Sequence, residues 1–356
     1  MTTAFDPLDL SGTRLSNRIA LAPMTRSRAG EGGTATDLTV DYYTQRASAG
    51  LLITEGIQPS VVGQGYPSTP GLHSAEQIAS WRKVTDSVHA AGGRIFAQVM
   101  HAGRIGHPVL LPDGLVPVAP SPVTAPGQLY THVGPKDFVE PHELTDEEIR
   151  ATVGDFVTAS RNAIDAGFDG VELHGANGYL IQQFLAPNTN LRTDGWGGSD
   201  QGRIRFAVEV ATAVAAEIGG SRTAMRVSPG NPYNGIEEPE PRAVYTALAS
   251  ALEPLGLAYL HVLEQADTRE LTLALRKRFT GTLVINVFTE GPTGPEHHTV
   301  IDDGIADIIS YGALFLANPD LPARLKAGGP FNTPDPTTFF GGDAKGYTDY
   351  PALDTV

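Results

Sequence analysis

A cluster of hydrogen-bond donors occupies the run VELHGANGYLIQQF at residues 171–184. His174 and Asn177 can each offer an N–H to one substrate oxygen, and the Tyr179 hydroxyl, with a reference pKa of about 10, stays protonated at neutral pH. Donors that polarise an oxygen beside a group that can release a proton suit the reduction of a polarised double bond. The alternative is a polar strand-to-helix loop in which His174 and Asn177 merely satisfy backbone groups.

The elements around this cluster form a regular pattern of short apolar runs and longer helical stretches. The expected strands are 18–22, 51–55, 94–99, 170–174, 223–228, 258–263, 282–287 and 307–311. The expected helices include 37–49, 74–91, 146–166, 201–218, 241–255 and 268–279. Thr145 and Glu148 form a capping box before one helix, and Gly167 stands at its expected end.

Eight strand–helix units predict one (β/α)8 TIM barrel over residues 1–356, an α/β fold. An open Rossmann sheet is disfavoured because no GxGxxG opens a helix after the first strand. The Pro- and Gly-rich segment 101–142 is too long for an ordinary βα loop, so we expect a lid or capping insertion over the barrel mouth.

Residues just past the strands should converge, because active sites of such barrels form at the strand C-termini. The candidates there are Pro23, Met24, Thr25, Gly56, Gln98, Met100 and Arg226. An arginine within the apolar run AMRVSP is costly unless it is paired. Its guanidinium would suit the negative charge of a reduced flavin, with Gln98 on a ring amide or carbonyl. The alternative is an internal salt bridge from Arg226 to Glu172 or Glu55.

Composition excludes several function classes. The net charge of −15 and the lack of a Lys/Arg block argue against nucleic acid, and no apolar run reaches the roughly 18 to 20 residues of a membrane helix. The chain has no cysteine, which excludes disulfides and thiolate sites. His297 and His298 have no partner at ligand spacing, so we expect no metal site. MTTAFDPLDL lacks the pattern of a secretory signal, which makes a cytoplasmic location the expectation.

Many motifs resemble those of the old yellow enzymes, which are flavin-dependent ene-reductases, from residue 5 to residue 351. They are NRIALAPMTRSRA (17–29), YYTQRASAGLLITEG (42–56), GYPSTPGLHS (65–74), AQVMHAGR (97–104), the run 171–184, RTDGWGGS (192–199), RVSP (226–229), ANPDL (317–321) and GYTDYP (346–351). The resemblance implies a TIM barrel with FMN at the strand C-termini.

The resemblance also implies roles for single residues. On the cofactor side, Thr25 would donate to flavin O4, Pro23, Met24 and Gly56 would line the ring, and Gln98, Arg226 and His174 would contact its polar edge. Asn286, Val287, Gly312 and Ala313 would lie by the phosphate. On the substrate side, His174 and Asn177 would bind a carbonyl or nitro oxygen, Tyr179 would be the proton donor, and Tyr66, Met100 and Phe340 would contact the substrate.

The implied reaction has two steps at one site. NAD(P)H gives a hydride to flavin N5 and leaves, and an activated alkene then takes that hydride at Cβ while Tyr179 protonates Cα. The implied partners are NAD(P)H and a small activated alkene, with the protein a monomer or homodimer and without a membrane or nucleic-acid partner.

The chain departs from the family at the phosphate. Relatives usually read Gly-Arg after the eighth strand, where this chain has Gly312 and Ala313, and a Gly-rich turn after the seventh, where it has 286–289. We therefore expect weaker or rerouted FMN binding, or a flavin with another tail such as a deazaflavin. Two further readings stay open: a redox-neutral isomerase or cyclase in a flavin-free pocket, and a catalytically silent binding protein.

The substrate pocket also departs from the family. Met100 replaces an aromatic residue, and Phe340 stands where some relatives have tyrosine. Both changes favour a roomier, apolar pocket for bulky enones, although Met100 could simply be core. His261, on the sixth expected strand, is expected to be a core histidine.

Overall fold

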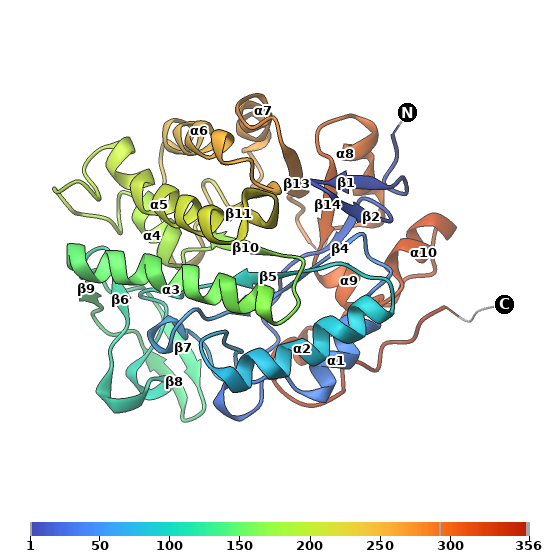
Figure 1. The fold of residues 1–356 in the computed structure, drawn as a ribbon, viewed down its shortest axis with the longest axis horizontal. Coiled ribbons are helices and arrows are strands. Elements are labelled where there is room, and N and C mark those ends of the chain that lie inside the picture. The colour runs from blue at the N-terminus through green and yellow to red at the C-terminus, as the bar shows by residue number, and fades with distance from the viewer. Residues whose placement is uncertain (1, 292, 354–356) are drawn as a thin grey trace.

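The computed structural model describes residues 2–291 and 293–353, and its centre is a closed barrel of eight parallel strands (Figure 1). In chain order the strands are β3 (Ile19–Leu21), β4 (Leu51–Ile57), β5 (Ile95–Val99), β10 (Gly170–Gly175), β11 (Thr223–Val227), β12 (Tyr259–Leu263), β13 (Thr282–Asn286) and β14 (Ile308–Tyr311). β14 pairs with β3 and so closes the barrel. This confirms the predicted (β/α)8 fold and all eight predicted strands.

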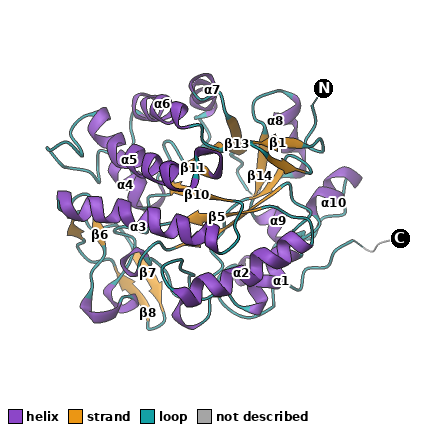
Figure 2. Ribbon diagram, viewed as in Figure 1, coloured by secondary structure: helices purple, strands orange, loops and turns teal. Residues whose placement is uncertain are grey.

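Helices surround the strands, as Figure 2 shows in purple around orange. They are α1 (Asp37–Thr44), α2 (Ala75–Ala90), α3 (Asp146–Asp165), α4 (Leu180–Leu185), α5 (Asp200–Ile218), α6 (Pro241–Leu252), α7 (Arg269–Arg278), α8 (Thr299–Asp302), α9 (Ala313–Ala317) and α10 (Leu321–Ala327). The capping box of Thr145 and Glu148 begins α3, and Gly167 has a positive φ of 92° just beyond its end, as predicted.

One helix is shorter than its sequence pattern indicates. We predicted a helix over 37–49, but α1 ends at Thr44. The amides of Arg46 and Ala47 bond three residues back, to Tyr43 and Thr44, which tightens the chain into turns before β4. The Arg46 guanidinium meanwhile donates to the carbonyls of Tyr42 and Leu316, so its side chain ties the turn to α9.

The two ends of the barrel are built differently. At the N-terminal end, the antiparallel hairpin of β1 (Leu8–Leu10) and β2 (Thr13–Leu15) places Leu10 and Leu15 against the barrel interior, in one buried cluster with Phe96 and Tyr259. That end is therefore packed with apolar side chains, and the polar residues collect at the opposite end.

The segment 101–142 contains several short elements of its own. They are β6 (Val118–Ala119), β7 (Gln128–Thr131) and β8 (Gly134–Asp137), and β6 pairs with β9 (His142–Glu143). β7 and β8 form an antiparallel hairpin, seen at the lower left of Figure 1.

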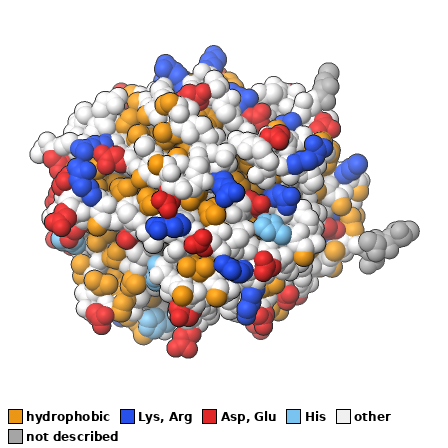
Figure 3. Space-filling view, viewed as in Figure 1, with side chains coloured by type: hydrophobic (Ala, Val, Ile, Leu, Met, Phe, Trp, Pro, Cys, Tyr) orange, Lys and Arg blue, Asp and Glu red, His pale blue; other side chains and the backbone are white. Residues whose placement is uncertain are grey.

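The surface is mixed in charge. On the face drawn in Figure 3, acidic and basic side chains are interspersed. Among the described helices, none combines the length and the hydropathy needed to cross a bilayer.

Candidate active site

A single cavity of about 1080 Å³ gathers most of the predicted site residues at the C-terminal ends of the strands. Its volume slightly exceeds the roughly 300–1,000 Å³ typical of ligand pockets, which leaves room for a cofactor and a substrate together. The predicted residues in its lining are Pro23, Met24, Thr25, Tyr66, Gln98, Met100, His174, Asn177, Tyr179, Arg226, Ala313 and Phe340. The parallel register explains part of this convergence, because His174 on β10 pairs with Arg226 on β11.

His174 presents a neutral N–H donor. Its Nδ1 accepts the backbone N–H of Ala176 at 3.3 Å, so the ring hydrogen is on Nε2. Burial, with the positive charge of Arg226, holds the pKa of His174 well below its ordinary value of 6.5. At neutral pH this histidine can donate a hydrogen bond but carries no charge.

Asn177 is held rigidly beside it. Its backbone is left-handed, with a φ of 58°, a conformation that asparagine tolerates better than most residues. Its N–H donates to Ser228 Oγ at 2.9 Å, and its carbonyl accepts from Asn234 Nδ2 at 2.8 Å. The loop after β11 therefore fixes the main chain that carries the Asn177 side chain.

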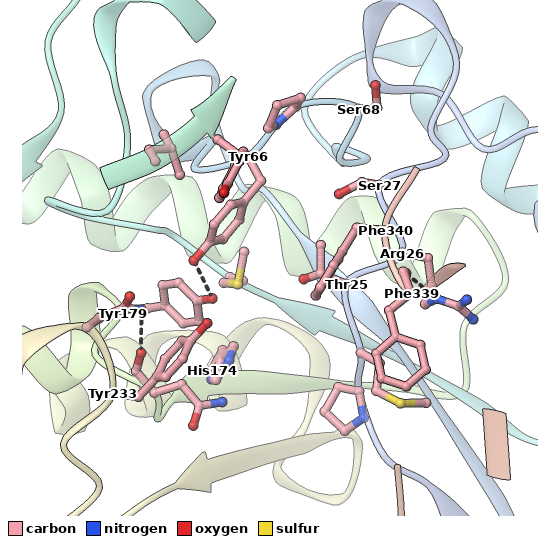
Figure 4. Close-up of a pocket in the computed structure, with 18 of the residues that line it drawn as sticks. Thr25, Arg26, Ser27, Tyr66, Ser68, His174, Tyr179, Tyr233, Phe339 and Phe340 are labelled. Atoms are coloured by element: carbon pink, nitrogen blue, oxygen red, sulfur yellow. Dashed lines mark hydrogen bonds between the residues drawn. The ribbon is translucent and has the colours of Figure 1, made fainter. Parts of the chain in front are cut away.

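Tyr179 and Tyr66 form a phenol pair. Their hydroxyls lie 3.0 Å apart and their rings are perpendicular, and Figure 4 shows the two side chains pointing toward each other. Burial raises the pKa of Tyr179 well above 10 and that of Tyr66 to about 12, so both are protonated at neutral pH. Tyr179 also directs its ring edgewise to His174, with ring centres 5.0 Å apart.

Two further polar side chains line the same cavity. Gln98 provides a hydrogen-bond acceptor, and Arg226 provides a positive charge. Gln98 Nε2 donates to Glu172 Oε1 at 2.7 Å, which leaves the Gln98 oxygen for the cavity. Arg226 forms no salt bridge with any described residue, and its buried Nε has no partner. The predicted alternative of an internal salt bridge to Glu172 or Glu55 is thus wrong, because Glu172 is paired with His261 instead.

A chain of buried polar contacts extends from Gln98 through Glu172 and His261 to Ser310. Glu172 Oε2 lies 2.8 Å from His261 Nδ1, and His261 Nε2 lies 2.9 Å from Ser310 Oγ. Burial would raise the pKa of Glu172, but His261, Arg226 and the Gln98 hydrogen bond outweigh it and lower that pKa. His261 is therefore a satisfied core histidine, as expected from the sequence.

Several predicted cofactor residues lie outside the cavity lining. Gly56 is covered by Met100, because a Cβ at that position would lie 2.6 Å from the Met100 sulfur. Asn286 turns its amide to the Ser310 carbonyl at 2.9 Å and so bridges β13 and β14. Val287 and Gly312 are also absent from the lining, so on the phosphate side only Ala313 reaches the cavity.

Met100 belongs both to the cavity lining and to a buried cluster. It lines the cavity and also packs in a small buried cluster with Tyr179, Ala102 and Ile105, against which Tyr66 is packed. Its neighbour Gly56 makes room for the flexible thioether.

Some lining residues were not predicted individually, although Tyr130 lies in the predicted lid segment 101–142 and Phe339 precedes the predicted Phe340. Tyr233 and Asn231 follow β11, Tyr130 is on β7, and Phe339 belongs to the C-terminal segment. The only available signal for Asn231 was a polar run directly after a barrel strand, SPGNPYN at 228–234.

The C-terminal segment reaches the cavity because two arginines hold its backbone. Arg26 Nε donates to the Phe339 carbonyl at 3.0 Å, drawn in Figure 4, and Arg28 Nη2 donates to Thr338 at 3.0 Å. Phe340 is thereby kept near Thr25, across the cavity from Tyr179 (Figure 4).

Comparison with known proteins places this site in a family. Residues 3–332 match the model of the NADH:flavin oxidoreductase / NADH oxidase family. Chanoclavine-I aldehyde reductase of Penicillium roqueforti is 42% identical over 98% of this chain and 96% of its own. 12-Oxophytodienoate reductase 1 of rice (Oryza sativa) is 39% identical over 98% of this chain and 93% of its own.

Solved structures agree with the sequence comparison. Morphinone reductase superposes with a TM-score of 0.94 at 40% identity, covering 99% of this chain and 97% of its own. A further structure is that enzyme in complex with tetrahydroNAD. With matches over nearly the whole length and the same barrel, this chain is an oxidoreductase that belongs to the NADH:flavin oxidoreductase family, the old yellow enzymes.

Proposed function

We propose that the protein is an ene-reductase that uses FMN and NAD(P)H to reduce the C=C bond of α,β-unsaturated carbonyl or nitro compounds. The observation that carries the proposal is that the donors His174 and Asn177 and the protonated Tyr179 share one cavity with an unpaired Arg226. Neither a redox-neutral catalyst nor a silent binding protein needs that unpaired cation.

The polar edge of an isoalloxazine fits the described residues. A flavin offers an imide N–H and carbonyl oxygens, to which the Gln98 oxygen and the Arg226 guanidinium are complementary. Thr25 supplies a further hydroxyl in the lining of the cavity. Bound FMN would supply hydride chemistry, accepting a hydride from NAD(P)H and passing one to the alkene carbon.

Residues of the chain would activate the substrate and donate the proton. His174 Nε2–H and the Asn177 amide bind the substrate oxygen and draw electron density from the double bond. Tyr179 gives its proton to the carbon next to the activating group, and the Tyr66 hydroxyl, 3.0 Å away, can donate to the phenolate that this leaves. Figure 4 shows both phenols, with His174 close to Tyr179.

The mouth of the cavity favours a bulky apolar substrate. Three aromatic side chains from separate segments stay largely exposed around it, Tyr130 at 79%, Tyr233 at 57% and Phe340 at 68%. Exposed aromatics that ring one cavity gain stability when a ligand covers them. The similar proteins are named for morphinone, 12-oxophytodienoate and chanoclavine-I aldehyde, which supports a carbonyl compound as the substrate of this chain.

The hairpin of β7 and β8 would act as the lid over this substrate. Leu129, Tyr130 and Thr131 on the hairpin line the cavity, so it can cover a ligand without reaching the barrel floor.

Anaerobic half-reactions test the function. NAD(P)H should bleach the visible flavin band, and an enone should restore it in proportion to the saturated product. Protein reconstituted with FMN that converts an enone without consuming NAD(P)H would favour the redox-neutral alternative. Protein that does neither would favour the binding protein. Comparing cyclohexenone with steroid-sized enones tests the substrate class, since a strict preference for the small one contradicts it.

A further inference from the structure

Asn231 links the backbone N–H of Tyr233 to the side chain of Asn177 through two hydrogen bonds. The N–H of Tyr233 donates to Asn231 Oδ1 at 3.0 Å, and Asn231 Nδ2 donates to Asn177 Oδ1 at 2.9 Å. Asn231 is nearly buried, so water does not compete strongly for these contacts.

This chain of contacts has only one consistent polarity. A backbone N–H can only donate, so the group of Asn231 that it meets must be the oxygen. The opposite end of Asn231 is then its NH2 group, which can only donate, so it must meet the oxygen of Asn177. The remaining end of Asn177, its Nδ2, has no acceptor among the described residues, and the side chain lines the cavity.

The neighbouring histidine is oriented in the same way. The backbone N–H of Ala176 occupies His174 Nδ1 and so leaves Nε2–H as the free donor. Both donors for the substrate oxygen are therefore set by main-chain amides, directly for His174 and through Asn231 for Asn177.

We propose that Asn231 is a positioning residue that holds the Asn177 amide with its NH2 group toward the cavity, and thereby selects ligands that present an acceptor oxygen. This inference rests on the proposed function for the reaction, but it makes a separate claim about binding.

The test is an isosteric variant, Asn231→Asp, beside Asn231→Ala. Aspartate still accepts from the Tyr233 N–H, but its carboxylate cannot donate to Asn177 Oδ1. The Asn177 amide should turn over, donate to the introduced carboxylate and present its oxygen to the cavity. We expect the Kd for 2-cyclohexen-1-one, measured calorimetrically on oxidised holoenzyme, to rise by about 100-fold, since a repulsive contact replaces a hydrogen bond.

Asn231→Ala leaves Asn177 free to keep its NH2 group toward the ligand. Its Kd should rise by about tenfold or less. A merely structural role for Asn231 predicts the reverse order, because alanine also loses the contact to the Tyr233 N–H. An alanine effect equal to or larger than the aspartate effect would therefore overturn the inference.

A double-mutant cycle separates amide reversal from a direct effect of the new charge. In an Asn177→Ala background, Asn231→Asp should add little further loss of binding. An undiminished aspartate effect in that background contradicts the inference. Lowering the pH should also partly restore binding by the Asn231→Asp single variant, because a protonated carboxyl can donate again.

The binding readout keeps two failures apart. Wild-type holoenzyme that binds cyclohexenone without reducing it contradicts the proposed function, while the order of the variants still decides on Asn231. Wild-type protein that does not bind this ketone at all overturns the proposed selection for an acceptor oxygen.

Discussion

Gln98 and Glu172 lie side by side on neighbouring strands, and the 2.7 Å hydrogen bond from Gln98 Nε2 to Glu172 Oε1 makes Gln98 an acceptor toward the cavity. The same carboxylate lies 2.8 Å from His261 Nδ1 and forms no salt bridge with Arg226, but its negative charge still acts on the buried Arg226 guanidinium. Glu172 therefore determines both the polarity of one cofactor contact and the charge that remains available for a reduced cofactor.

This arrangement predicts the effect of Glu172→Gln on the redox potential. Removing a buried negative charge near Arg226 stabilises a reduced, anionic flavin, so the midpoint potential should rise by about 30 mV or more, where 30 mV is about 1.4 kcal/mol for a two-electron couple. Spectroelectrochemical titration of the FMN-loaded protein measures this shift.

Glu238→Gln is the matched control. Glu238 is also a largely enclosed carboxylate that accepts from a glutamine amide, Gln182 Nε2 at 3.3 Å, and from Tyr245 at 2.8 Å, but it does not line the cavity. The Glu238→Gln variant should have a lower melting temperature but an unchanged flavin midpoint potential. Equal shifts in the two variants would show that Glu172 has no specific effect on the cofactor.

Tyr179→Phe should remove the proton donor and leave the cofactor side intact. The alkene half-reaction should slow by about 10² to 10⁴, which is typical of losing a general acid, while flavin reduction by NAD(P)H persists. Stopped-flow measurement of the two half-reactions separates these effects. An unchanged alkene rate would show that the proton comes from another group.

Tyr66→Phe should have a smaller effect on the same step. It removes a hydrogen bond to the phenolate that Tyr179 becomes, which is worth about 1.5 kcal/mol, so the alkene half-reaction should slow by roughly tenfold. The hydroxyl separation of 3.0 Å places Tyr66 within hydrogen-bond distance of that phenolate. A loss as large as that of Tyr179→Phe would instead identify Tyr66 as the proton source.

The fold was predictable because it depends on local periodicity that recurs along the chain. Each barrel strand is a short apolar run, and the capping box at Thr145 depends on residues close in sequence. The donors His174 and Tyr179 were identified because one lies near the end of β10 and the other shortly after it. Asn231 was not found, since its contact with Asn177 joins residues 54 positions apart and depends on loop geometry. The position of Gly56 outside the cavity lining was also not predictable, because the sequence does not show that Met100 covers it.

Buried His101 should make the stability depend on pH. Burial lowers its pKa from 6.5 to about 3, so between these values the unfolded chain binds a proton that the folded chain does not. Stability is thus fully present above about pH 6.5 and falls on acidification, by up to about 1.4 kcal/mol per pH unit.

His101→Asn tests this dependence and keeps an acceptor for the Gly103 N–H, which bonds His101 Nδ1 at 3.1 Å. Urea unfolding at pH 7 and pH 5 should show that the variant loses about 2 kcal/mol less than the wild type over this interval. Because buried His174 also resists protonation, some pH dependence should remain. Equal losses in both proteins would show that His101 does not contribute.

Ala313 predicts weak discrimination between FMN and riboflavin. The guanidinium groups in the described cavity lining are those of Arg26 and Arg226, and Arg26 is bonded to the carbonyls of Phe339 and Gly346. No arginine of the described cavity lining is therefore available beside Ala313 for the phosphate. The Kd values of the two flavins, measured by fluorescence quenching, should agree within about tenfold.

Ala313→Arg should lower the Kd for FMN by about 10- to 100-fold, which corresponds to one charge-assisted hydrogen bond, and should leave the Kd for riboflavin unchanged. Ala313→Gln adds comparable length without charge and should not produce this selectivity. If the wild-type protein already binds FMN a thousandfold more tightly than riboflavin, the phosphate is held by other groups and the substitution at position 313 has not weakened its site.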